Sequence, residues 1–393
     1  MRLDFRQTRF MRRLMVASAL AVLAVGSSPA FAKIECPLKI GSVRPESGGG
    51  ASFGQSLARG LTMGIEEVNA AGGIDGCPIE LIAYDTQSLP ANAATLTNRL
   101  ISQDDVKLIL GSSISTETLA MMEVTENRGF PLYVPSAASA KITNQGAKWV
   151  WRQSVIDAKA AELFVQYIID TFGYKKIGAV YENTDYGHDP VMGIIAPALK
   201  KHGIEVSTEA FNTGDSDVSS QLLSLKGAGA EAIIFWGHEK EGALVTRQNI
   251  QLGMNLPILG NTGLVYPAYL DLLTDDEQAN TNLQAVSQFV WTTDVPAQVA
   301  WIDRYRAKYN LSPDVTSMDG YDSIFLLKQA YEAAGSTDPE SLKKALGEIR
   351  FKGVGGTISF DETGQALRSL IVVKLTPKSE GGFKIVKILE PGK

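Results

Sequence analysis

The chain is poor in the residues from which most metal and redox sites are built. It has two cysteines and three histidines among 393 residues, and no CxxC or HExxH spacing. A Walker sequence and a complete GxGxxG loop are also missing. We therefore expect neither a metal site nor a cofactor.

Clusters of lysine and arginine are absent as well. The formal net charge is −6, and because residues 1–32 contribute +4, the rest of the chain carries −10. Contacts to a phosphate backbone need grouped cations, so nucleic acid is not an expected partner.

The only long apolar run lies near the N-terminus. It extends from Leu14 to Val25, which is shorter than the ~18 residues of a membrane-spanning helix. Arginines precede it and Ala30-Phe31-Ala32 follows it. This order is typical of a cleaved secretory signal peptide at residues 1–32. We therefore expect an exported, periplasmic protein.

The two cysteines, Cys36 and Cys77, each precede an apolar strand-like segment, at 38–43 and 79–84. If those strands are adjacent and parallel, both thiols lie at the same end of the sheet. Export favours a disulfide between them, with two free thiols as the alternative.

Strand-like runs alternate with helical patterns along most of the chain. This alternation predicts two α/β lobes, each a doubly wound parallel sheet with helices on both faces. We expect a hinge near residues 149–154, helices at 297–309 and 317–334 that pack back on the first lobe, and a C-terminal tail of short strands. The predicted strands are 38–43, 79–84, 107–110, 132–134, 176–181, 204–210, 232–236, 258–259, 282–291, 357–360, 370–375 and 383–388.

Serine-rich turns follow two neighbouring predicted strands, between Leu108 and Ser139. The carboxyl ends of parallel strands are where small ligands bind, so we expect a shared crevice there. Helix-start amides near Ser115 and Thr116 would suit a carboxylate. The alternative is that Ser115 only caps the helix. The hydroxyls expected to converge belong to Ser112, Ser113, Ser115 and Ser136.

Gly50-Ala51-Ser52-Phe53-Gly54 matches the GxSxG pattern of a serine-hydrolase nucleophile. That nucleophile requires a sharp turn directly from strand to helix, whereas here a loose glycine loop intervenes after Val43. We interpret the loop as a close approach of backbone to a ligand, with Ser52 capping the helix. A secreted serine hydrolase is the weaker alternative.

Several segments in order resemble the periplasmic leucine/isoleucine/valine-binding type of solute receptor. They are residues 40–76, LILGSSIS at 108–115, PSAAS at 135–139, YENTDYG at 181–187 and RQNIQLGMNLPILGNTG at 247–263. The resemblance implies two lobes joined by a three-segment hinge that close on a ligand. It places lobe 1 at 33–153 and 290–366, and lobe 2 at 154–289 and 367–393.

The resemblance also implies a ligand pocket. Phe53 would form an aromatic wall, Ser115 would bind the ligand carboxylate, and the turn after the next strand would grip the same group. Ala138 lacks a hydroxyl there, and Ser139 offers one instead. Tyr186 and His238 would close from the second lobe. The positions carried over are Phe53, Ser115, Ser136, Ala138, Ser139, Tyr186, His238 and Thr262.

Thr262 departs from the family, because amino-acid binders place an acidic residue there for the α-ammonium group. A buried ammonium without its carboxylate costs roughly 2 to 5 kcal/mol. Either another acid supplies the charge, or the ligand is an aromatic or aliphatic carboxylate without an amino group. The candidate acids are Asp157, Glu182 and Asp319.

Two arginines are candidates for the carboxylate. Arg44 follows the first strand and could form a bidentate pair with the ligand carboxylate. Arg152 lies at the proposed hinge, where a structural role is the alternative.

The function expected from these residues is binding without catalysis. We expect a periplasmic receptor that delivers a small carboxylate solute to the permease subunits of an ABC importer in the inner membrane. A ligand-sensing module for a membrane signalling partner would share the same fold and pocket.

Overall fold

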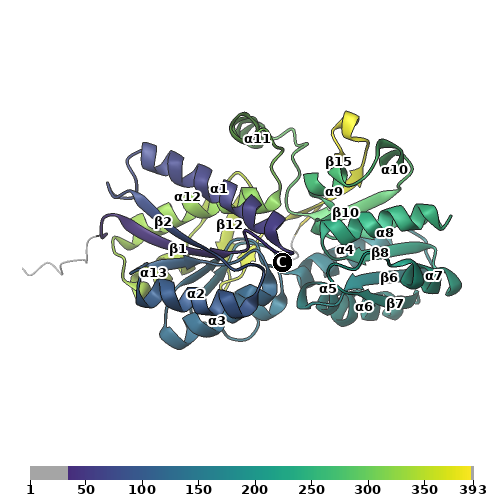
Figure 1. Cartoon of the computed structure of the whole chain (residues 1–393), viewed down its shortest axis with the longest axis horizontal. Helices are drawn as coiled ribbons and strands as arrows, with labels where there is room; N and C mark the ends of the chain where they lie inside the picture. Colours follow the sequence, from purple (N-terminus) through teal and green to yellow (C-terminus); the bar gives the residue numbers. More distant parts are fainter. Residues whose placement is uncertain (1–33, 391–393) are drawn as a thin grey trace, which may run out of the picture.

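The computed structural model describes residues 34–390, so the expected signal peptide lies outside the described residues. Two lobes lie side by side (Figure 1). The first is built on a parallel sheet with strand order β2-β1-β3-β4-β5. Its strands are β1 (Leu38–Arg44), β2 (Ile79–Asp85), β3 (Leu108–Leu110), β4 (Leu132–Val134) and β5 (Val150–Arg152).

The second lobe has a sheet with strand order β15-β14-β10-β9-β8-β6-β7. Strands β6 to β10 are parallel, and β14 and β15 extend the sheet in antiparallel fashion. The strands are β6 (Lys176–Glu182), β7 (Glu205–Phe211), β8 (Ala232–Trp236), β9 (Ile258–Gly260), β10 (Leu283–Ser287), β14 (Leu370–Leu375) and β15 (Phe383–Leu389).

Helices cover both faces of each sheet (Figure 1). Those of the first lobe are α1 (Ala51–Ala70), α2 (Pro90–Ser102), α3 (Ser115–Arg128), α11 (Pro296–Tyr309), α12 (Val315–Ala334) and α13 (Pro339–Glu348), with the turn η1 (Ala140–Ile142). Those of the second are α4 (Asp157–Thr171), α5 (Asp185–Pro190), η2 (Val191–Ile195), α6 (Ala196–Lys201), α7 (Ser219–Gly227), α8 (Glu239–Gln251), η3 (Thr262–Leu264), α9 (Pro267–Asp271), α10 (Asp275–Ala279) and η4 (Lys378–Glu380). The predicted α/β class with two mainly parallel sheets is confirmed.

The contact between α1 and α12 positions the N-terminus of α1 at the cleft. Helix α1 buries an apolar stripe that includes Leu57 and Leu61. A Cβ at Gly60 would lie 2.0 Å from the carbonyl oxygen of Ser317, so glycine is needed for the two backbones to meet. The second glycine of the GxSxG match, Gly54, is held against the carbonyl of Pro45 in the same way. Close packing therefore accounts for Gly54.

A small antiparallel sheet follows α13 in the first lobe, before the last crossing of the chain. It consists of β11 (Phe351–Gly353), β12 (Gly356–Phe360) and β13 (Ala366–Leu367), and it packs against α12 and α13. The chain thus passes between the lobes after β5, after β10 and between β13 and β14.

Hydrogen bonds connect these three crossings. The backbone N–H of Val155 donates to Gln288 (3.0 Å), joining the first crossing to the second. The side chain of Gln365 donates to the carbonyl of Ser154 (2.8 Å) and accepts from Arg152 Nε (2.6 Å), joining the third crossing to the first. The expected hinge at 149–154 is therefore part of a bundle of three bonded segments.

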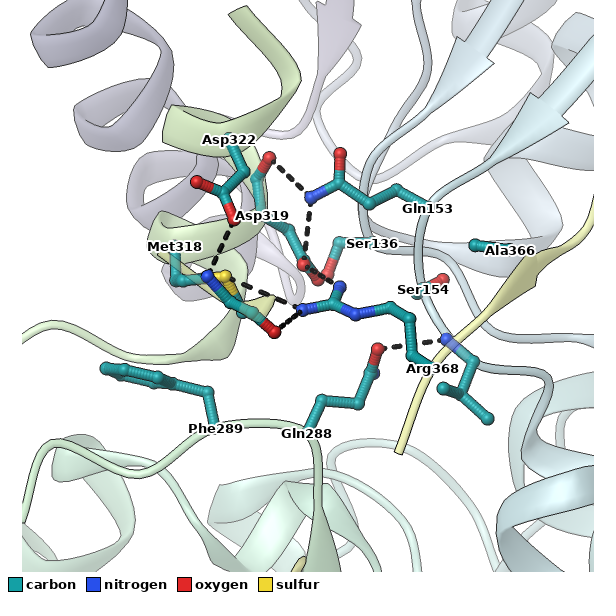
Figure 2. Close-up of polar contacts among 12 residues, drawn as sticks. Ser136, Gln153, Ser154, Gln288, Phe289, Met318, Asp319, Asp322, Ala366 and Arg368 are labelled. Atoms are coloured by element: carbon teal, nitrogen blue, oxygen red, sulfur yellow. Dashed lines mark hydrogen bonds and ion pairs between the residues drawn. The ribbon is translucent and has the colours of Figure 1, made fainter. Parts of the chain in front are cut away.

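A buried ion pair anchors the third crossing to the first lobe. Arg368 Nη1 lies 2.8 Å from Asp319 Oδ1 on α12, and both side chains are almost completely buried. Gln153 donates to the same carboxylate oxygen (3.1 Å). Figure 2 shows Arg368 reaching from the segment between β13 and β14 to Asp319, close to Ser136.

The expected disulfide is present between Cys36 and Cys77, at the same end of the paired strands β1 and β2. It closes a loop of 41 residues in sequence. In the chain-entropy model, such a loop stabilises the fold by about 3 to 4 kcal/mol. We predict that replacing both cysteines with alanine lowers the free energy of unfolding by about that amount in denaturant titrations. A loss below about 1 kcal/mol would contradict the stabilising role.

The hinge ion pair gives a second prediction. Replacing Asp319 with asparagine leaves the Arg368 guanidinium buried without a counter-charge, so the free energy of unfolding should fall by roughly 3 kcal/mol. Glu332→Gln breaks an exposed i,i+4 pair with Lys328 and should change it by less than about 0.5 kcal/mol. Equal effects of the two substitutions in urea unfolding would refute the importance of the buried pair.

Candidate functional site

A cavity of about 340 Å³ lies between the lobes, where the carboxyl ends of the parallel strands of both sheets meet. This is the edge at which α/β folds bind small ligands. Segments that follow all five strands of the first sheet and all five parallel strands of the second contribute to its lining. The lining includes every predicted position from the family comparison except Ser139.

The first lobe contributes neutral hydrogen-bond donors. Ser113, Ser115 and Thr116 line the cavity where α3 begins, and Ser136 and Ala138 line it after β4. The Ser113 hydroxyl is buried and has no hydrogen-bond partner among the described residues. The start of a helix is a favourable place for an anion because unpaired N–H groups point outward. The arrangement can therefore bind a carboxylate without a cation.

For this turn, the alternative that Ser115 caps the helix and the expectation that Ser112 faces the crevice were wrong. The N-cap position of α3 is Ile114, and no side chain forms a capping hydrogen bond there, so Ser115 is not the cap. The Ser115 hydroxyl instead accepts from the backbone N–H of Ser139 (3.2 Å). Ser112 faces away from the cavity, since its hydroxyl donates to Glu117 (2.6 Å) and accepts from the N–H of Ile114 (3.0 Å).

The second lobe contributes a buried carboxylate at the first residue of α4. Asp157 lines the cavity and is 8% exposed, and its Oδ2 accepts no hydrogen bond from the described residues. Burial raises the pKa of Asp157 well above its ordinary value, although the charges of Arg152 and His238 oppose the rise. The site therefore holds an acid whose ionised form lacks a protein partner.

His238 forms a charged pair with Glu182, and both line the cavity. Burial acts to lower the pKa of His238, but the hydrogen bond and charge of Glu182 overcome it and the pKa is raised. The pKa of Glu182 is lowered: burial opposes this, but His238 and Thr213 outweigh it. Each group thus favours the charged form of the other, and the hydrogen bond between them occupies both.

Aromatic rings from both lobes form one wall. Phe53 meets His238 edge to face with ring centroids 4.8 Å apart, and it meets Tyr266 in the same way at 5.0 Å. Tyr186 lies 4.8 Å from His238 and accepts a hydrogen bond from Asn261 (2.6 Å). These rings can bury the apolar body of a ligand.

The side chains at three other predicted positions are hydrogen-bonded within the protein. Thr262 lines the cavity, but its hydroxyl donates to the carbonyl of Val286 (3.1 Å). Arg44 is buried outside the lining, where its guanidinium donates to Ser42 (2.8 Å) and Glu46 (2.6 Å). Ser139 also lies outside the lining, and its hydroxyl accepts from the N–H of Lys141.

Arg152 has the structural role that was the alternative for it. The guanidinium is fully buried and donates to Gln365, Thr143 (2.7 Å) and the carbonyl of Ser139. It is absent from the cavity lining, so it is not placed to bind a ligand there.

Sequence reasoning missed several lining residues, among them Glu239, Tyr266 and Gln288. Glu239 follows the end of β8 directly after His238, so the rule that strand ends face the ligand could have found it. Its Oε1 accepts from the Ser52 hydroxyl on α1 (2.7 Å), across the cleft. Ser52 neither caps α1, whose cap is Gly50, nor contacts a histidine as a hydrolase serine would.

Contacts between the lobes continue at the rim. Lys141 of the first lobe bonds Asp185 of the second and lies 3.2 Å from Asp189. Within residues 34–390 there is no cluster of three potential metal ligands, and no helix has the length and hydropathy to span a membrane.

Comparison with known proteins identifies the family to which this architecture belongs. The model of the periplasmic binding protein family matches residues 37–382. The leucine-, isoleucine-, valine-, threonine- and alanine-binding protein of Pseudomonas aeruginosa is 28% identical over 88% of this chain and 91% of its own length. A leucine-binding protein of Thermotoga maritima is similar in structure, with a TM-score of 0.82, 27% identity and coverage of 90% of this chain and 99% of that one.

A branched-chain amino acid receptor of Streptococcus pneumoniae, solved with isoleucine, has a TM-score of 0.80 and 28% identity over 89% of this chain and 99% of that one. The resemblance noted in the sequence is thus confirmed, and the role it carries is solute binding and not catalysis. The chain belongs to the periplasmic binding protein family.

Proposed function

We propose that this protein is the periplasmic receptor of an ABC importer and binds a zwitterionic α-amino acid between its lobes. The observation that carries the proposal is Asp157, a buried carboxylate with an unpartnered oxygen on the wall of a cavity whose other lobe offers only neutral donors. The export signal and the permease partner rest on the sequence and on family membership.

The carboxylate of the solute binds to the first lobe. Hydroxyls of Ser115 and Ser136 and the free N–H groups opening α3 surround one end of the cavity. Because no arginine or lysine of that lobe lines the cavity, the negative charge is balanced by dipoles and by the solute's own ammonium.

The ammonium of the solute binds to Asp157. Glu182 is already paired with His238 and Thr213, and Asp319 is paired with Arg368 at the hinge, so neither is available. Asp157 therefore takes the role that an acid at the position of Thr262 has in the family. The positive end of α4 adds stabilisation to its charged form.

Relatives support an amino acid as the solute. The Pseudomonas aeruginosa protein is named for five aliphatic and hydroxyl amino acids, and the Streptococcus pneumoniae protein was solved with isoleucine. Ligand contacts to both lobes favour the closed arrangement, which then presents the surface that a permease reads.

Calorimetric titration with a panel of amino acids tests the proposal. We expect at least one α-amino acid to bind, and Asp157→Asn to weaken its affinity by about 30-fold or more because the ammonium loses its charged partner. Asp170→Asn, an exposed position on the same helix, should leave binding unchanged. Binding of aromatic or aliphatic acids alone, insensitive to Asp157→Asn, would contradict the proposal.

The free protein gives a separate prediction. Because the folded pKa of Asp157 is raised, its contribution to stability is fully present below the ordinary value of 3.8 and is lost as pH rises through the folded pKa. Above pH 3.8 the buried carboxyl group therefore lowers stability, because the same group ionises more readily in the unfolded chain. Asp157→Asn should raise the unfolding free energy of ligand-free protein by roughly 1 to 2 kcal/mol near neutral pH.

The gain should disappear well below the ordinary carboxyl pKa, where wild-type Asp157 is protonated as well. Denaturant unfolding at both pH values, compared with Asp170→Asn, makes the measurement. A variant less stable than wild type at neutral pH would show that Asp157 has a structural partner.

A further inference from the structure

A second carboxylate on the cavity wall also lacks a full set of partners. Glu239 is the first residue of α8, lines the cavity and is 2% exposed. Its Oε1 accepts from Ser52, whereas its Oε2 is buried and accepts no hydrogen bond from the described residues. A buried charged oxygen without a donor is costly, so a donor from the cavity would stabilise it.

The other acids of the second lobe that line the cavity, Glu182 and Glu241, have hydrogen-bond partners within the protein. Glu182 is bound by His238 and Thr213, and Glu241 accepts from the backbone N–H of Gly214 (2.9 Å). Among the cavity carboxylates, only Asp157 and Glu239 have a buried oxygen without a partner in the described part of the chain. The α-ammonium group of the proposed solute satisfies one of them and leaves Glu239.

Charges around Glu239 do not neutralise it. His238 is paired with Glu182. The exposed side chain of Lys240 also lines the cavity, but it forms no ion pair with Glu239 in the described part of the chain. The first lobe lines the cavity without charged side chains. The start of α8 favours a negative charge at Glu239, because the helix dipole is positive there. A cation is therefore the complement that this part of the cavity requires.

Asp157 begins α4 and Glu239 begins α8, and the aromatic rings of the cavity wall contact one another. Both Tyr186 and Phe53 pack against the imidazole ring of His238, and Phe53 also packs against Tyr266. Tyr186 is close enough to both acids for their charges, after burial, to raise its pKa. An aliphatic chain along these rings would connect a head group at Asp157 to an end group at Glu239.

The geometry points to Glu239 as a specificity-determining residue that selects an α-amino acid with a cationic side chain, whose amine or guanidinium donates to Oε2. This inference rests on the proposed function and adds the side-chain class. Desolvating a cation in the cavity is favourable only with a charged acceptor, whereas a neutral side chain of the same length leaves Glu239 unpaired.

Matched pairs of amino acids test the selection. Ornithine is compared with norvaline, lysine with norleucine and arginine with citrulline, by calorimetric titration of the wild-type protein and of Glu239→Gln. At least one cationic member should bind the wild type on the order of 30-fold more tightly than its neutral counterpart. In Glu239→Gln, which keeps the shape of the side chain, that ratio should fall to about 3 or less.

Three controls separate the possible failures. Glu205→Gln, at an exposed position of the same lobe, should keep the wild-type ratio. Binding of norleucine or norvaline by Glu239→Gln shows that the site remains folded, and a melting temperature no lower than that of the wild type supports it. If neutral members bind as tightly as cationic ones, or if Glu239→Gln keeps the ratio, the inference is wrong while the proposed function stands. If no amino acid binds the wild type, the proposed function itself has failed.

Discussion

The cleft is organised by an electrostatic asymmetry in which one lobe supplies uncharged donors and the other supplies acids. Ser115, Ser136 and the amides that open α3 face Asp157 and Glu239 across a cavity that contains no arginine. Two of those acid oxygens are buried without protein donors, which lowers the stability of the empty protein. A fold tolerates such groups where a ligand completes them, because binding then recovers the missing interactions. The proposed solute and its proposed orientation rest on this asymmetry.

Close packing around the cleft holds the donors and the acids in position. Glycines let α1 and α12 approach closely, so the start of α1 is fixed at the cleft with Phe53 on the cavity wall. The hinge is anchored by the ion pair of Arg368 and Asp319, and Gln288 both binds the first crossing and lines the cavity. A ligand that contacts Gln288 can therefore act on the hinge directly. Ser52 and Glu239 form a separate hydrogen bond between the lobes.

Much of this arrangement could be predicted from the sequence. Apolar runs bounded by turns identified most strands to within one or two residues, as at 38–43 against Leu38–Arg44, because buried parallel strands leave a strong pattern. The short strands β11 and β13 were not predicted. The extended run at 282–291 was too long, since only Leu283–Ser287 pairs in the sheet. The family resemblance brought Phe53, Ser115 and His238 to one cavity.

Local rules failed where a side chain had two possible partners. Arg44 leaves its strand at the correct end but bonds Glu46, and Ser112 turns inward to Glu117. The role inferred for Glu239 also involves its hydrogen bond from Ser52, 187 residues away in sequence, which no local pattern contains.

A crystal structure of the protein with its bound amino acid measures the central claim most directly. The account predicts that the solute carboxylate lies within hydrogen-bond distance of Ser115 and the N-terminus of α3, with the ammonium against Asp157. A solute in the opposite orientation, or one whose nitrogen contacts Thr262 while Asp157 stays unpartnered, would contradict it.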